Sequence, residues 1–431
     1  MKANQFVPDR DFGILFIVML ITGAGNTALQ SILPVIGRSI NVDDWLIATI
    51  FSVSALIWVF AAPYWARRSD REGRRSMVIV GISGFTVSII LIAFILLAGL
   101  LGWIGPTTTI FAVITARIIY GTFGAAAPPA AQAMVALKTN RSQRVKALTL
   151  LGSAFGLGTI IGPAIAPWLV LPGLGYAGPA FVFAGIGLLA TLSAIIWLPR
   201  DIEGETGFAR GANMSYPSLA GAPAGASATA AAAEPVRATL KLTDPRIWPW
   251  MLAGLIMGHA QAITGSATGF LVIDRLHLLA TDPATQQAIG LVLMTGAGAA
   301  LFVQWGLIPM LNLPPRTMLL LGLVVATIGL LMTAYATSLY GIASSYALSS
   351  MGFGLTRPSF TAGSSLAVGR NLQGLVAGRV TSINGASFVL GPSLGVLMYD
   401  KGFHALPFIV SAVILILMIP YAAVKLRDVQ T

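Results

Sequence analysis

Long apolar runs recur along the whole chain, and they restrict its fold more than any other feature. An α-helix needs about 20 mostly apolar residues to cross a hydrocarbon core about 30 Å thick. The runs are longer than membrane strands and lack their polar–apolar alternation. Only 10% of the 431 residues are charged, against about 25% in soluble domains. We therefore predict an all-α membrane protein with twelve spans. They lie at residues 12–36, 45–65, 76–102, 108–136, 147–170, 178–198, 246–273, 287–311, 317–335, 339–366, 376–399 and 403–424.

The positions of the basic residues predict how these spans are oriented. The net charge is +11, and 21 of the 26 Lys and Arg residues fall in one set of alternate loops and near both termini. The opposite set of loops holds Arg38, Arg275 and Lys401, while Arg117 and Arg357 lie inside spans. Because cytoplasmic loops retain Lys and Arg, we expect both termini in the cytoplasm. The positive charge therefore reflects topology, and we expect no nucleic-acid partner.

One long polar connection, residues 199–245, divides the chain into two halves of six spans, 1–198 and 246–431. Its middle is rich in Ala, Gly, Ser and Pro, which predicts a flexible cytoplasmic linker. The halves also resemble each other in sequence, with Gly162 and Pro163 matching Gly391 and Pro392 at an offset of 229. Duplicated six-helix halves are typical of secondary transporters, whose binding site lies between the halves near the bilayer midplane.

The loop between the second and third spans carries a recognisable motif, Ala66-Arg67-Arg68-Ser69-Asp70-Arg71-Glu72-Gly73-Arg74-Arg75. Apart from Ala66 in place of the first Gly, it resembles the Gly-x-x-x-Asp-Arg-x-Gly-Arg-Arg loop of the major facilitator superfamily. The resemblance implies a conformational latch between the halves at the cytoplasmic face, where a carboxylate pairs with Arg and with a helix N-terminus. The alternative is a loop whose arginines only set topology. The implied latch residues are Asp70, Arg71, Gly73, Arg74 and Arg75.

The fifth span contains Gly158, Gly162 and Pro163, and it partly matches the antiporter motif of the same superfamily. Gly391 and Pro392 form the counterpart in the eleventh span. Small residues four apart let helix backbones approach closely, and Pro163 loosens the helix where it bends. The resemblance implies the major facilitator fold of two pseudo-symmetric six-helix bundles, and it is closest to the twelve-helix drug:proton antiporters of bacterial inner membranes.

Two arginines lie inside predicted spans, where a charge is costly and marks a pathway or a paired partner. Arg117 begins Arg117-Ile-Ile-Tyr120-Gly121, which is similar to the superfamily's Arg-x-x-Gln-Gly motif with Tyr120 in place of Gln. Its alternative role is a structural bond to a neighbouring helix. Arg357 precedes Arg370 by thirteen residues, about 20 Å along a helix. A buried charge at Arg357 predicts either an anionic ligand group or a hidden carboxylate.

Six uncharged or titratable polar side chains also lie deep in predicted spans. Asn26 and Gln30 are one helical turn apart and share a face, and His259 lies opposite Asn26 at an offset of 233. For each Asn and Gln, an interhelical hydrogen bond is the alternative. The candidate substrate-binding residues are Asn26, Gln30, Arg117, His259, Gln261, Gln304, Arg357 and Asn384.

Proton coupling has two candidate residues. No carboxylate falls in the middle of a predicted span, although many proton-driven members of the superfamily use one there. His259 is the mid-span group whose unperturbed pKa lies near neutrality, which makes it the first candidate. Its alternative is a neutral imidazole bonded to a neighbouring helix. Asp274, at the outer mouth of the seventh span, is the second candidate.

Together these features predict a secondary transporter that exports small amphiphilic or hydrophobic compounds in exchange for protons. An apolar, aromatic cavity with few polar groups suits such ligands. We also expect the protein to act as a monomer in the lipid bilayer. A proton-coupled uptake permease for a small anionic metabolite, with Arg117 and Arg357 as clamps, remains open, as does a signalling or scaffold protein. With no Cys, three His and no nucleophile–base constellation, we expect no enzyme activity, no metal and no cofactor.

Overall fold

The computed structural model describes residues 8–139, 141–199, 242–279, 282–311, 313–368 and 373–426. These residues are almost entirely helical, with one isolated β-bridge between Leu171 and Gly175. The predicted all-α class is therefore confirmed. Most of the predicted linker, residues 200–241, lies outside the described residues, so the boundaries 1–198, 199–245 and 246–431 remain predictions.

The first half of the chain forms six long helical segments, two of which are not continuous α-helix. The fourth segment passes through a 3₁₀ turn, and the fifth ends in one, both in places where the sequence predicted uninterrupted spans. The elements are α1 (Arg10–Ser39), α2 (Asp44–Glu72), α3 (Arg74–Leu100), α4 (Pro106–Phe123), η1 (Gly124–Ala126), α5 (Ala127–Lys138), α6 (Arg141–Ile165), η2 (Ala166–Leu169) and α7 (Gly178–Trp197).

The second half repeats the arrangement, and its second segment contains a π-helical turn, η3, which lies between two α-helices. Such turns insert one extra residue into the helical ladder. The elements are α9 (Trp248–Arg275), α10 (Pro283–Phe302), η3 (Val303–Leu307), α11 (Ile308–Leu311), α12 (Pro315–Tyr335), α13 (Leu339–Leu366), α14 (Gln373–Lys401) and α15 (Leu406–Lys425).

Nine of the helical segments in the described part of the chain are long and apolar enough to cross a membrane. Helices α9, α13 and α14 are as long, at 28, 28 and 29 residues. They carry more polar side chains, among them His259, Arg357 and Asn384. With these three helices included, the segments match the twelve predicted spans.

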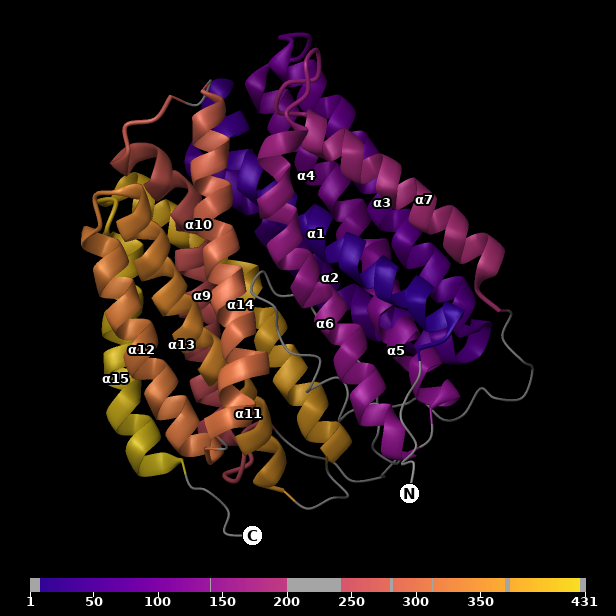
Figure 1. Cartoon of the computed structure of the whole chain (residues 1–431), viewed down its shortest axis with the longest axis vertical. Coiled ribbons are helices and arrows are strands. Elements are labelled where there is room, and N and C mark those ends of the chain that lie inside the picture. Colours follow the sequence, from indigo (N-terminus) through magenta and orange to yellow (C-terminus); the bar gives the residue numbers. More distant parts are fainter. Residues whose placement is uncertain are drawn as a thin grey trace.

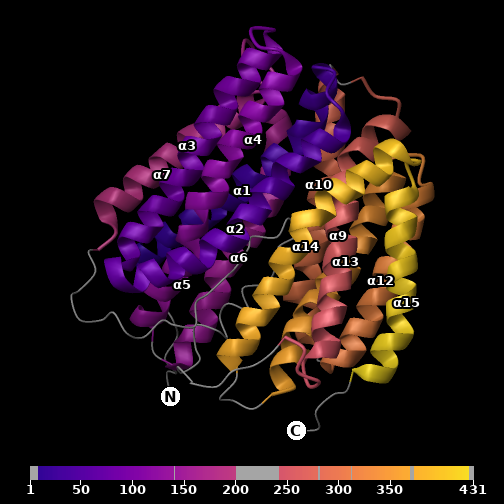
Figure 2. The same ribbon diagram turned by 180° about the vertical axis from the view of Figure 1, so that it is seen from behind.

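Figures 1 and 2 show the two halves as separate helix bundles that lie side by side. The indigo-to-magenta helices form one bundle, and the orange-to-yellow helices form the other. Helix α1 begins and α15 ends at the same end of the molecule. We call the opposite end, where α1 turns into α2 and where α9 finishes, the far end.

A glycine separates α2 from α3 and explains one position of the loop motif. Gly73 has a φ of 94°, which lies in the left-handed region that glycine adopts at little cost. Because α2 ends at Glu72 and α3 begins at Arg74, the chain changes direction within the motif. The backbone therefore requires Gly73 whatever the neighbouring charges do.

The glycines of the fifth-span motif lie where α6 contacts α1. A Cβ added to Gly158 or Gly162 would lie 2.3 or 2.2 Å from a carbonyl oxygen of α1, closer than any side chain tolerates. Gly391 and Gly395 make the equivalent approach of α14 to α9. Close helix packing of this kind needs small residues, so the motif positions hold α6 on α1 and α14 on α9.

Backbone-level contacts also join the two bundles. A Cβ on Gly290 of α10 would lie 2.7 Å from the carbonyl oxygen of Pro163 in α6. Between α14 and α2, the hydroxyl oxygens of Ser393 and Ser52 are 2.8 Å apart. A Cβ on Gly269 of α9 would lie 3.1 Å from the ring of Pro34 in α1. At these three points the bundles therefore meet through small side chains, prolines and backbone atoms.

Candidate functional site

A cavity lies between the two bundles and is lined by six helices, two from the first half and four from the second. Glutamines from both halves, Gln30 of α1 and Gln261 of α9, contribute amide groups to its wall. Tyr346 and Ser350 of α13 add hydroxyl groups. The remaining lining residues are Thr27, Thr159, Pro163, Gly265, Leu293, Gly296, Ala297 and Phe388. Its described wall is mixed polar and apolar and contains no charged residue, which suits an amphiphilic ligand.

A second cavity continues from the first toward the far end. It shares Gln30 with the central cavity and is otherwise lined by residues of α1, α2, α9 and α14, including Phe51 and Phe270. The guanidinium of Arg38 lies 5.4 Å from the centroid of the Phe270 ring. The second cavity therefore shares one lining residue with the central cavity, and another of its lining residues contacts Arg38 at the far end.

Arg117, on α4, is buried and is bonded to side chains of the first bundle. Its Nη2 donates to Oδ1 of Asn26 at 2.8 Å and to Oγ of Ser54 at 3.3 Å. The guanidinium also lies 5.3 and 4.6 Å from the ring centroids of Phe51 and Tyr120. Cation–π contacts and hydrogen bonds together compensate the buried charge. The tyrosine at the motif's Gln position thus forms one wall of the arginine site.

Arg357, on α13, is the buried arginine on the fourth helical segment of the second bundle. Its side chain is buried, and Nε donates to Oε1 of Gln261 at 2.5 Å. The guanidinium lies 5.6 Å from the ring centroid of Phe388 on α14. In both halves, therefore, an arginine of the fourth helical segment binds a side-chain amide of the first segment. Each arginine also lies against a phenylalanine, on α2 in the first half and on α14 in the second.

These pairings show which predicted residues come together. Asn26 with Arg117 and Gln261 with Arg357 form two pairs, one in each bundle, and Gln30 and Gln261 reach the central cavity. His259 is half-buried, and its Nδ1 lies 2.8 Å from the carbonyl oxygen of Leu255 in its own helix. Gln304, within η3, and Asn384 of α14 are half-buried. Neither is among the lining residues of the two cavities.

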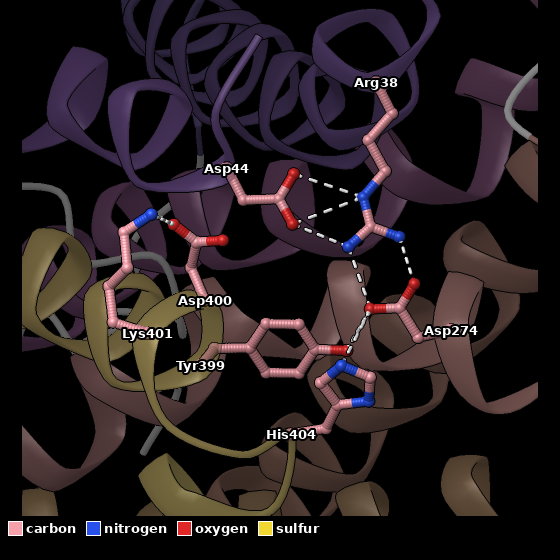
Figure 3. A network of polar contacts seen from close by, with 7 residues as sticks. All are labelled: Arg38, Asp44, Asp274, Tyr399, Asp400, Lys401 and His404. Atoms are coloured by element: carbon pink, nitrogen blue, oxygen red, sulfur yellow. Dashed lines mark hydrogen bonds and ion pairs between the residues drawn. The ribbon is translucent and has the colours of Figure 1, made fainter. Parts of the chain in front are cut away.

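A network of charged and polar side chains joins the bundles at the far end, as Figure 3 shows. Arg38 of α1 donates to Asp44 of α2, with Nη2 and Oδ2 2.6 Å apart. The same Nη2 lies 2.8 Å from Oδ2 of Asp274 on α9, and Nη1 binds the second oxygen of Asp274. The Arg38–Asp274 contact is bidentate and crosses between bundles, and such fork-like pairs are the strong ones. We call Arg38, Asp44, Asp274, Tyr399 and His404 the far-end network.

The second bundle holds Asp274 in place from its own side. The Tyr399 hydroxyl donates to Oδ2 of Asp274 at 2.5 Å, and Nε2 of His404 lies 3.7 Å from the same oxygen. The Tyr399 and His404 rings stack with centroids 4.7 Å apart. Sequence reasoning found Asp274 and missed the other four residues of the far-end network. A signal was present, since Arg38 is one of only three basic residues on its side of the membrane and Asp44 follows six residues later.

The predicted cytoplasmic latch is described only in part. The side chains of Asp70 and Arg71 lie outside the described part of the structure. Arg75, at the start of α3, donates to the carbonyl oxygens of Leu198 and Ile195 at 2.9 and 2.5 Å. These bonds tie α3 to the end of α7 within the first bundle. The latch between halves therefore remains a prediction.

Two six-helix bundles around a shared central cavity, each with a buried arginine, define the architecture of a secondary transporter. The family comparison agrees with that architecture. The model of the Major Facilitator Superfamily matches residues 15–392, and the chain belongs to this superfamily. It is a multi-pass membrane transporter.

Several curated relatives of the chain are drug-resistance proteins. The chain is similar to multidrug resistance protein 2 of Bacillus subtilis, at 24% identity over 93% of this chain and 90% of the relative. It is also similar to the class G tetracycline resistance protein of Vibrio anguillarum, at 24% identity over 94% and 95%. The class B tetracycline resistance protein of Escherichia coli is 27% identical, and there the match spans only 43% of each chain.

A solved structure supports the fold alone. The crystal structure of the human organic anion transporter MFSD10 aligns with a TM-score of 0.65 and 18% sequence identity, over 96% of this chain and all of that one. At this identity the likeness extends to the arrangement of helices and not to a shared substrate.

Proposed function

We propose that the chain exports small amphiphilic or hydrophobic compounds across a bacterial inner membrane by alternating access, in exchange for protons. The observation that carries the proposal is the central cavity, whose wall comes from both bundles and mixes amide, hydroxyl and apolar groups. The resistance functions named for the relatives support export of compounds of this kind. Each chain contains both bundles, so we propose that it works as a monomer.

Orientation follows from the basic residues. We propose that the end where α1 begins and α15 ends faces the cytoplasm, because most Lys and Arg residues lie in the loops on that side. The far end then faces the periplasm. In that orientation the far-end network closes the periplasmic side, and rocking of one bundle against the other opens each side in turn.

Asp274 and His259 are the two proposed proton-coupling residues. The charge of Asp274 acts directly on the contact between bundles, since a neutral carboxyl loses the ionic attraction of Arg38. Protonation of Asp274 would therefore favour opening of the far end, and substrate binding must favour the opposite change for exchange to occur. His259 is bonded within its own helix, so its titration would act more locally.

The transport test uses membrane vesicles that contain the full chain and three amphiphiles of different charge, namely tetracycline, ethidium and naphthalene-1-carboxylate. In everted vesicles with an acidic interior, we expect at least one of them to accumulate, and a protonophore to release it. A lack of proton-dependent accumulation for all three in either orientation would contradict transport and support the signalling or scaffold alternative.

The uptake permease is the second candidate function, and one observation favours it. Two buried arginines lie on equivalent helices of the two bundles, as anion clamps would. Accumulation of naphthalene-1-carboxylate in right-side-out vesicles, lost in Arg357→Ala, would establish uptake in place of export.

Replacing Asp70 by Asn is expected to slow transport about 10-fold or more while membrane insertion stays normal, because the variant loses a charge-assisted hydrogen bond of the proposed cytoplasmic latch. The initial efflux rate per inserted molecule measures the effect. Glu72→Gln is the matched control, because Glu72 pairs with Arg68 on an exposed helix face where ion pairs contribute little. An unchanged rate in Asp70→Asn would show that the loop motif only sets topology.

A further inference from the structure

The Arg357 guanidinium is buried without a full set of partners. Its side chain is 3% exposed, and only Nε is bonded, to Gln261. Nη1 and Nη2 are both buried and have no hydrogen-bond partner among the described residues. An arginine stays charged in proteins, and a buried charge without a partner costs far more than a buried neutral group. The structure therefore contains a cation inside the second bundle that is only partly compensated.

Two other arginines of the spans show what compensation looks like here. Arg38 binds two carboxylates, those of Asp44 and Asp274. Arg117 has hydrogen bonds from Nη2 to both Asn26 and Ser54, and two aromatic rings lie against its guanidinium. Arg357 has one hydrogen bond, from Nε to the amide oxygen of Gln261, and one aromatic ring against its guanidinium, that of Phe388. From the sequence, a hidden carboxylate remained a possible partner of Arg357. Among the described residues, no carboxylate is bonded to Arg357.

Arg357 lies directly behind the wall of the central cavity. Both residues that contact it, Gln261 through a hydrogen bond and Phe388 through its ring, are lining residues of that cavity. A ligand in the cavity would therefore meet Gln261 and Phe388, the two side chains that contact the guanidinium. Elsewhere in the cavity wall, Leu293 and Tyr346 provide apolar surface, and Ser350 provides a hydroxyl group.

We infer that Arg357 binds the carboxylate of the transported compound, with the compound's apolar body in the central cavity. The inference rests on the proposed function and names its substrate class, which is small aromatic or alicyclic acids. Two parallel N–H groups of a guanidinium fit the two oxygens of a carboxylate. A planar acid would then compensate the buried charge that the protein leaves open, and an uncharged amide of the same shape would not.

The experiment measures ligand binding to the purified full-length protein in lipid nanodiscs, by thermal shift and by titration calorimetry. The probes are naphthalene-1-carboxylate and biphenyl-4-carboxylate, each compared with its carboxamide. In the wild-type protein we expect the acids to bind about 10 to 100 times more tightly than the amides, as a hydrogen bond to a charged group provides. Arg357→Gln should lose this preference, while Arg357→Lys should keep part of it. Lys401→Gln, which removes a charge at the exposed Asp400–Lys401 pair, controls for net charge and should keep the preference.

Thermal stability without ligand gives a second, independent readout. Arg357→Gln removes a charge that is only partly compensated, so we expect it to melt no lower than the wild-type protein. Arg117→Gln disrupts the bonds to Asn26 and Ser54, and we expect it to melt at least about 3 °C lower. A structural role for Arg357 would lower the melting temperature in both variants and would overturn the inference.

The outcomes separate this inference from the proposed function. Equal binding of acids and amides, no binding of either acid, or an acid preference that survives Arg357→Gln would each overturn the carboxylate site. Export of uncharged or cationic amphiphiles in vesicles would still support the proposed function in those cases. Acid binding that requires Arg357, without proton-linked flux in either vesicle orientation, would support the site and contradict the exporter.

Discussion

An Asp274→Asn variant is expected to open its far end about 10 to 100 times more often than the wild-type protein. Breaking a buried ion pair by removing one partner costs about 3–5 kcal/mol. The Arg38 and Asp274 side chains are 22% and 23% exposed, so solvent screens part of that energy and we expect about 1.5–3 kcal/mol. Asn has nearly the volume of Asp, which leaves the surrounding packing intact. The variant therefore isolates the charge that holds one bundle to the other.

The chain offers a clean way to measure this opening, because it contains no Cys. A single cysteine at Ser350, in the wall of the central cavity, reports access from either side. In right-side-out vesicles, a membrane-impermeant maleimide should label Ser350→Cys slowly and label the double variant with Asp274→Asn about 10 to 100 times faster. Proton-driven efflux should fall at the same time, since a transporter that favours one open state completes few cycles.

Lys401→Gln serves as the control at the same end of the molecule. Lys401 pairs with its neighbour Asp400 in the second bundle, and its side chain is 63% exposed, so its loss should leave labelling unchanged. If Asp274→Asn labels no faster than the wild-type protein, the far-end network does not hold the periplasmic side closed. The proton-coupling role proposed for Asp274 would then be lost as well.

Gly162→Val is expected to destabilise the first bundle by about 3 kcal/mol or more and to remove transport. A Cβ at this position would lie 2.2 Å from the carbonyl oxygen of Ala24 and 2.5 Å from Oγ1 of Thr27. Overpacking usually costs about 1–3 kcal/mol. Here the obstacle includes helix backbone, which cannot rotate aside, so α6 must move away from α1. Melting temperature and the yield of monodisperse protein measure the change.

Gly185→Val is the matched control for this substitution. Gly185 also lies in a spanning helix, α7, and a Cβ there meets nothing within 4 Å. It therefore reports the small helix-propensity cost of Val without a clash. If the two variants melt within about 1 °C of each other, the Gly162 contact does not support the bundle in the way that the structure indicates.

The spans were predictable because bilayer thickness fixes their length and apolarity, whatever the tertiary contacts are. The interruptions were not. The apolar pattern does not mark the π-helical turn Val303–Leu307. The 3₁₀ turn Gly124–Ala126 is followed, after Ala127, by Pro128 and Pro129, which lack the N–H groups of a continuous α-helix, and a count of apolar residues does not register that signal. Three helices near the cavity, α9, α13 and α14, were recognisable as spans only by length and position, since polar residues lower their hydropathy.

The candidate cavity residues were predictable as buried polar groups, but their partners were not. The offset of 233 placed His259 opposite Asn26, whereas Gln261, two residues further on, is the residue whose amide binds Arg357. Two residues correspond to about 200° around a helix. A small error in register therefore moves a side chain to the other face, and a repeat with few identical residues does not fix the register that closely.

In the alternating-access cycle proposed above, the far-end network has a consequence for the height of the barrier between the two open states. When the bundles part, Arg38 keeps Asp44 from its own bundle, and Asp274 keeps Tyr399 and His404 from the other. Arg38 and Asp274 therefore each keep a hydrogen-bond partner, and only the contact between the two of them is replaced by contacts with water. In the proposed cycle, local partners of this kind would hold both ions while the far end is open, so that its closure is strong and its release still fast.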